Sequence, residues 1–219
     1  MPRKLHPRRK ITKRCTTLSR RRGSRPPTRR QLGLEPRYTA KKFRPYALAI
    51  GEATLSWNHL HVELGMLFAT VSGGGYVNEF FEKWSAIRSD AQKCKLLLET
   101  AEASLNLTSQ RDQKAFAEVT WLLDTVHDLA EDRNTVTHAA LTSTPTASIV
   151  FPNAWPGDRF AQRLEGYDVL AAYRRLRDTA ILLRDYAGRL AQALARERPS
   201  WPDRPILPVR PKAVTALPQ

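Results

Sequence analysis

The chain has 219 residues, enough for one domain with flanking tails, and a formal charge of +15. Its two cysteines, Cys15 and Cys94, exclude a disulfide framework and a cysteine-rich metal site, and they favour a reducing, cytoplasmic location. No apolar run reaches the ~20 residues that a membrane span needs, so we expect no contact with a membrane.

The basic excess lies entirely in residues 1–45. This segment holds 17 of the 36 Lys and Arg residues but only one of the 21 acids, Glu35, so residues 46–219 keep 19 basic and 20 acidic groups. It is also poor in large apolar residues, which predicts a disordered arm. Three interpretations stay open: a tether that binds RNA or DNA by counterion release, an organellar transit peptide, or a start assigned too far upstream. The clustered basic residues that would contact a nucleic acid are Arg8, Arg9, Lys10, Arg20, Arg21, Arg22, Arg29 and Arg30.

Residues 46–198 are expected to fold as one helical domain, because apolar side chains recur there at alternating spacings of three and four. The predicted helices cover residues 46–71, 76–88, 90–105, a stretch from 110 onward, and about 168–196. Ser89 and Ser109 are predicted N-caps of the third and fourth helices. The predicted packing positions are Trp57, Leu60, Leu64, Leu67, Val71, Phe80, Phe81, Trp84, Ile87, Cys94, Leu97, Leu98, Ala101, Leu105, Phe116, Val119, Leu123, Val126, Ala130, Tyr173, Leu176, Ala180, Leu183, Ala187, Leu190 and Leu194.

Residues 141–155 break the helical pattern, and Ile149-Val150-Phe151 favours a short β-hairpin or an extended loop before the last long helix. The sequence therefore predicts an all-α protein, an up-and-down bundle of about five helices. A proline-rich tail, residues 199–219, follows. It is expected either to lie in an apolar groove or to stay loose on the surface. Five prolines recur at every third position and would share one edge of a polyproline II helix: Pro199, Pro202, Pro205, Pro208 and Pro211.

The most informative stretch is Arg133-Asn134-Thr135-Val136-Thr137-His138, at the end of the fourth helix. Arginine grips a phosphate with a fixed fork of donors, and histidine exchanges a proton near neutral pH. Asparagine orients its neighbours because it donates and accepts hydrogen bonds at once. This combination of residues suits the cleavage of a phosphodiester without a metal.

The same run matches the Arg-Asn-x-x-x-His signature of the HEPN superfamily, whose helical dimers often cut RNA. The chain resembles this superfamily over about residues 46–198. The resemblance implies a homodimer without a cofactor, with the site at the dimer interface. It implies that Arg133 holds the scissile phosphate, that His138 is a general acid or base, and that Asn134 orients either of them.

The spacing within the motif raises a geometrical question. On a continuous helix, five residues at 100° each leave Arg133 and His138 about 140° apart, so the two side chains would diverge. Two solutions are open. In the first, the helix ends before His138, because the β-branched run Thr135-Val136-Thr137 has weak helix propensity. Alternatively, a two-fold dimer places both copies of the motif in one cleft.

Two further residues of this helix, His127 and Glu131, share the face of Asn134 and His138 and are candidates for supporting the motif. Glu131 is otherwise an ordinary solvated acid. A second group, His59, His61 and Glu63, has too few ligands on one face for a closed zinc site, and His61 falls near the apolar stripe. We therefore expect no metal site.

Two functions remain open. The first is a metal-independent endoribonuclease that leaves 2′,3′-cyclic phosphates, as a toxin or defence effector. The second is a non-catalytic, HEPN-like dimer that binds RNA, a nucleotide or a protein partner such as an antitoxin. The intact signature favours the enzyme, whereas the net charge of −1 over residues 46–219 favours the binding module.

Overall fold

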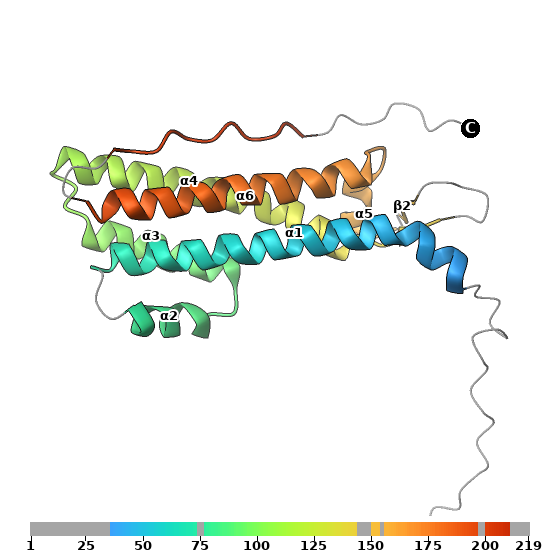
Figure 1. The fold of residues 1–219 in the computed structure, drawn as a ribbon, viewed down its shortest axis with the longest axis horizontal. Coiled ribbons are helices and arrows are strands. Elements are labelled where there is room, and N and C mark those ends of the chain that lie inside the picture. The colour runs from blue at the N-terminus through green and yellow to red at the C-terminus, as the bar shows by residue number, and fades with distance from the viewer. Residues whose placement is uncertain (1–35, 74–76, 144–149, 154–155, 197–199, 211–219) are drawn as a thin grey trace, which may run out of the picture. The chain divides into compact units, whose positions relative to one another are not determined.

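The computed structural model describes residues 36–73, 77–143, 150–153, 156–196 and 200–210. Within these ranges the helices α1 to α4 alternate in direction, and α6 runs beside α1 and α4 (Figure 1). The prediction of a mostly helical protein is confirmed. None of these helices combines the length and the apolar character needed to cross a bilayer. The elements are α1 Pro36–Val71, α2 Val77–Ala86, α3 Asp90–Ser104, α4 Gln110–His138, β1 Leu141–Thr142, β2 Phe151–Pro152, α5 Arg159–Leu164 and α6 Val169–Leu194.

One hydrophobic core joins α1, α3, α4 and α6. On α1 the predicted stripe of Trp57, Leu60, Leu64, Leu67 and Val71 is buried throughout. Most of the stripe predicted for the last long helix is also buried, so α6 closes its own bundle rather than offering that strip to a partner. The buried apolar residues of α4 and α6 are Ala115, Val119, Leu122, Leu123, Val126, Leu129, Val136, Val169, Tyr173, Leu176, Ala180, Leu183, Tyr186, Ala187, Leu190 and Ala193.

The first helix begins at Pro36, earlier than the predicted residue 46, so the expected boundary of the basic arm is wrong. Pro45 lies inside α1, where it removes one backbone hydrogen bond, and the first turns of the helix bend away from the rest (Figure 1). Tyr46 anchors this part of the helix, since its hydroxyl donates to the Val150 carbonyl at 3.4 Å and accepts from the Val150 amide at 3.3 Å. Residues 1–35, including all eight clustered basic residues, lie outside the described part of the chain.

The predicted helix caps are confirmed. The Ser89 and Ser109 hydroxyls accept from the amides of Gln92 and Asp112, each at 3.5 Å. The sequence reading missed α5, a short helix capped by Asp158, whose carboxylate accepts from two backbone amides. Its six residues are too few to show a helical period.

The expected β-structure before the last helix is confirmed as two short antiparallel strands, in which Leu141 pairs with Pro152 and Thr142 with Phe151. Ile149, which was part of the strand prediction, lies outside the described residues.

Residues 200–210 form an extended segment that runs alongside α4 and α6 (Figure 1). Its prolines at 202, 205 and 208 are half-buried, whereas Ile206 and Val209 are 95% and 87% exposed. The three-residue spacing thus turns one edge of the segment towards the helices. Trp201 and Leu207 pack against the hydrophobic core, so this part of the tail is held against the helices and is not loose on the surface. Pro199 and Pro211 lie outside the described residues.

Candidate functional site

The Arg-Asn-x-x-x-His motif occupies the last turns of α4, which continues without interruption to His138. The Ala139 amide still donates to the Thr135 carbonyl at 2.9 Å. Thr137 donates its hydroxyl to the Arg133 carbonyl at 2.9 Å, a bond that accommodates a β-branched residue in a helix. The helix therefore does not end before His138, and that solution to the spacing of the motif is wrong. Arg133 and His138 stay about 140° apart around the axis.

Arg133 is half-buried, and its Nη1 donates to Asn134 Oδ1 at 3.0 Å. It forms no ion pair with any residue in the described ranges. Other arginines on these helices and the tail pair with carboxylates, among them Arg163, Arg175, Arg177 and Arg204. Most donors of the Arg133 guanidinium are therefore available to an external anion.

His138 is exposed at the end of α4, and its ring centroid lies 5.4 Å from that of Phe160 on α5. The two supporting candidates sit apart from it. Glu131 pairs with Arg163 of α5 at 3.1 Å, so its carboxylate is engaged away from the motif. His127 is exposed two helical turns earlier in α4 than Asn134.

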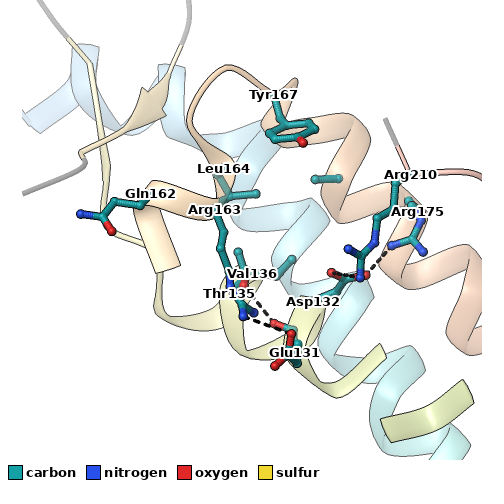
Figure 2. A pocket seen from close by; sticks show the side chains of 11 residues that line it. Glu131, Asp132, Thr135, Val136, Gln162, Arg163, Leu164, Tyr167, Arg175 and Arg210 are labelled. Atoms are coloured by element: carbon teal, nitrogen blue, oxygen red, sulfur yellow. Dashed lines mark hydrogen bonds and ion pairs between the residues drawn. The ribbon is translucent and has the colours of Figure 1, made fainter. Parts of the chain in front are cut away.

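A cavity of about 450 Å³ opens beside α4, α5 and α6, one side of it formed by Thr135 and Val136. Figure 2 shows Arg163 reaching towards Glu131, while Arg175 and Arg210 converge on Asp132. The two acids offset most of the positive charge of these arginines. The cavity is not lined by Arg133, Asn134 or His138. Its lining residues are Glu131, Asp132, Thr135, Val136, Gln162, Arg163, Leu164, Tyr167, Ala172, Arg175 and Arg210.

A second cavity, of about 260 Å³, lies among α1, α2 and the start of α3. Gly65 of α1 positions its α2 wall, because a Cβ at this residue would meet the Trp84 ring at 3.0 Å. The Trp84 indole then donates to the His61 carbonyl at 3.1 Å. The lining residues are Asn58, His61, Val62, Phe81, Trp84, Ser85, Asp90 and Lys93.

His61 is the buried polar group of this second cavity. Its side chain is 8% exposed, and neither ring nitrogen has a hydrogen-bond partner among the described residues. Its Nε2 lies 3.7 Å from Asp90 Oδ2, which already accepts from the Trp57 indole at 2.9 Å. The expectation that His61 falls near the apolar stripe is confirmed.

Burial is the largest influence on the pKa of His61 and lowers it below the ordinary value of 6.5. The Asp90 carboxylate raises the pKa, whereas the charges of Lys93 and Arg133 lower it further. His61 is therefore neutral at pH 7, and the charge of Arg133 is the smallest of these influences. Sequence reasoning missed this group, because Asp90 and Arg133 belong to other helices. The one available signal was a histidine inside an apolar stripe.

Within the described ranges, no group of three or more His, Cys, Asp or Glu side chains is placed to hold a metal ion. His59 is exposed and Glu63 is half-buried against Gly188 of α6, so they do not join His61 around one point. The chain matches no protein-family model, and neither curated proteins nor solved structures yield a significant match.

Proposed function

We propose that the protein is a metal-independent endoribonuclease of the HEPN type that acts as a homodimer. The observation that carries this proposal is the state of Arg133, a half-buried guanidinium without a carboxylate partner in the described ranges, in the motif that also holds Asn134 and His138. A buried arginine in a purely structural role normally has a carboxylate partner, as Arg175 has in Asp132. Arg133 is instead suited to an anionic ligand such as a phosphodiester.

In this proposal Arg133 binds the scissile phosphate and stabilises the charge that develops on it. Asn134 accepts from Arg133 and so limits the orientations of the guanidinium. His138, exposed at the helix end, exchanges a proton with the reacting oxygens. The 2′-hydroxyl of the RNA is the nucleophile, and the product is a 2′,3′-cyclic phosphate.

The divergence of Arg133 and His138 supports a dimer, because one uninterrupted helix cannot aim both side chains at the same atom. A second observation supports it as well. Four large apolar side chains of α1 are exposed on one face: Leu48 at 63%, Leu55 at 59%, Val62 at 50% and Met66 at 39%. Their spacings of seven, seven and four place them in one stripe, the pattern of a helix that pairs with another. Val62 also lines the cavity of His61, so a partner on this face would lie beside that cavity.

The test is cleavage of labelled RNA by the purified full-length protein in the presence of a chelator. The wild type is expected to cut and to leave 2′,3′-cyclic ends. Arg133→Ala and His138→Ala should each lose activity by at least ~10²-fold. Arg189→Ala removes an exposed arginine of α6 and is the matched control, which should cut like the wild type.

Cleavage by His138→Ala at the wild-type rate, or cleavage that requires a metal, would overturn the nuclease proposal. The second candidate, a non-catalytic module, is favoured by the near-neutral charge of residues 46–219. Its signature would be RNA binding without cleavage, with the binding lost in Arg133→Ala.

A further inference from the structure

The cavity of His61 has two properties that together point to a ligand. A buried polar atom without a hydrogen bond destabilises the folded state, and His61 leaves both ring nitrogens without a partner among the described residues. The cavity also brings together groups with different chemical roles. They are a neutral imidazole, the Asp90 carboxylate beside it, the Lys93 ammonium and the Asn58 amide.

Arg133 connects this cavity to the motif. Its charge is the last in size of the influences on the pKa of His61, after burial, Asp90 and Lys93, and it acts from outside the cavity lining. His138, by contrast, is on another side of α4 and contacts Phe160 of α5. Within one protomer, His61 is therefore the histidine on which the charge of Arg133 acts.

We propose that this cavity binds the scissile phosphodiester of an RNA, with Arg133 and Lys93 as its cations and His61, supported by Asp90, as the group that accepts the proton of the 2′-hydroxyl. This inference rests on the proposed ribonuclease function and names the residue that starts the reaction. It gives His61 and His138 different roles, with His61 the base and His138 of the other protomer the acid.

The chemical step balances without a metal or an oxidant. His61 takes the proton of the 2′-hydroxyl as O2′ bonds to phosphorus, and the bond from phosphorus to O5′ breaks. The departing O5′ takes a proton from protonated His138, and the products are a 2′,3′-cyclic phosphate and a free 5′-hydroxyl. Asp90, 3.7 Å from Nε2, stabilises the imidazolium that forms.

The size of the cavity limits the ligands that it can enclose. At about 260 Å³ it falls below the ~300–1,000 Å³ of sites that enclose a whole small molecule. A phosphate with its ribose fits this volume better than a complete nucleotide. The nucleobase of the substrate would then remain outside, and the cavity would contact the ribose and the phosphate but not the nucleobase.

The first test uses binding rather than catalysis, so it does not depend on finding the natural substrate. The imidazole resonances of the full-length protein are followed by NMR across pH, with and without inorganic phosphate, and His61 is assigned from the His61→Gln spectrum. Phosphate should shift the His61 resonance and raise its pKa, because an anion favours the imidazolium. His59, which is exposed on the same helix, is the internal reference, and its resonance should not shift when phosphate is added.

The same spectra test the placement of the charged groups. Without ligand, Arg133→Ala and Lys93→Ala should each raise the pKa of His61, because each removes a cation that lowers it. Asp90→Asn should lower it further, while the amide oxygen can still accept from Trp57. The proposal would be overturned if the His61 resonance and its pKa changed neither with tens of millimolar phosphate nor in Arg133→Ala, whether or not the protein cleaves RNA.

The second test is activity. His61→Gln should reduce cleavage by ~10²–10⁴-fold while the protein stays folded by circular dichroism. In the wild type, kcat/KM should decrease when the pH is brought below the lowered pKa of His61, because a protonated imidazole cannot act as a base. A His61→Gln protein that cleaves at the wild-type rate would refute the role of His61 and leave the nuclease proposal standing. If the wild type cuts no RNA, the ribonuclease proposal fails, and with it the role of His61 as base, whereas phosphate binding is decided by NMR.

Discussion

Glu118 of α4 accepts a hydrogen bond from Arg204 of the C-terminal segment, Nε to Oε2 at 2.7 Å, although only 2% of the Glu118 side chain is exposed. Tyr186 of α6 donates to the same oxygen at 2.6 Å, and Lys114 pairs with the other. A buried carboxylate is thus satisfied by groups from three separate parts of the chain. The contact fastens residues 200–210 to the bundle.

Removing Arg204 should therefore destabilise the whole domain. Arg204→Met keeps the length of the side chain but leaves Glu118 with only Lys114 and Tyr186, and we expect the free energy of unfolding to fall by about 1–3 kcal/mol. Urea denaturation followed by tryptophan fluorescence measures it. Ile206→Ser, at a neighbouring residue that is 95% exposed, is the control and should stay within about 0.5 kcal/mol of the wild type. Equal stability of Arg204→Met and wild type would mean that the segment is not fastened here.

Glu118 should also make stability depend on pH in the acid range. Burial raises the pKa of its carboxyl, but hydrogen bonds from Arg204, Lys114 and Tyr186 outweigh burial and lower the pKa from 4.5 to about 2. A carboxyl whose pKa is lower in the folded than in the unfolded state stabilises the fold at pH values above its unfolded pKa. This contribution is therefore present above about pH 4.5 and is lost as the pH falls towards 2.

The test compares urea denaturation of wild type and Glu118→Gln at pH 6 and at pH 4. Other carboxylates titrate alike in both proteins, so the difference between them isolates Glu118. The wild type should lose more stability than the variant on acidification, by at most ~1.4 kcal/mol per pH unit. Identical losses in the two proteins would contradict the depressed pKa.

The exposed stripe of α1 leads to a prediction about assembly. Leu55 lies in the middle of the stripe and is 59% exposed, so Leu55→Lys should leave the fold intact and place a charge where the partner would pack. Sedimentation should show about twice the chain mass of 24.9 kDa for the wild type and one chain for the variant. Leu107→Lys, at a 40% exposed leucine outside α1, is the control that should remain dimeric. A wild type that is monomeric at micromolar concentration would remove the dimer from the proposed function.

Deleting the basic arm should change RNA binding without changing the chemistry. Because α1 begins at Pro36, the deletion should remove residues 1–35 rather than 1–45, which takes away 13 basic residues and Glu35. The affinity for RNA should fall and its dependence on salt should flatten, since fewer counterions are released on binding. Filter binding between low and physiological salt measures both, and the rate at saturating RNA should be unchanged. An unaltered salt slope would show that the arm does not touch RNA.

The helices with a regular apolar spacing were predictable, because a buried stripe must recur with the period of the helix. The stripe of α1, the α6 helix and the serine caps all follow from local sequence. The divergence of Arg133 and His138 was also predictable, since it depends only on the 100° step along one helix. What this spacing implies for catalysis depends on whether the helix continues, and α4 does continue to His138.

The rest was decided by contacts between distant parts of the chain. The start of α1 was hidden by its basic composition and Pro45, and Tyr46 reaches a backbone more than one hundred residues away. The spacing of the prolines in the tail predicted that they share one edge of an extended segment. Only the packing against α4 and α6 shows that this edge is the one that faces the helices. His61 reads locally as one more residue of a buried stripe. It becomes a candidate base because Asp90 of α3 lies 3.7 Å away and Arg133 of α4 acts on it electrostatically, and no local pattern in the sequence encodes these interactions.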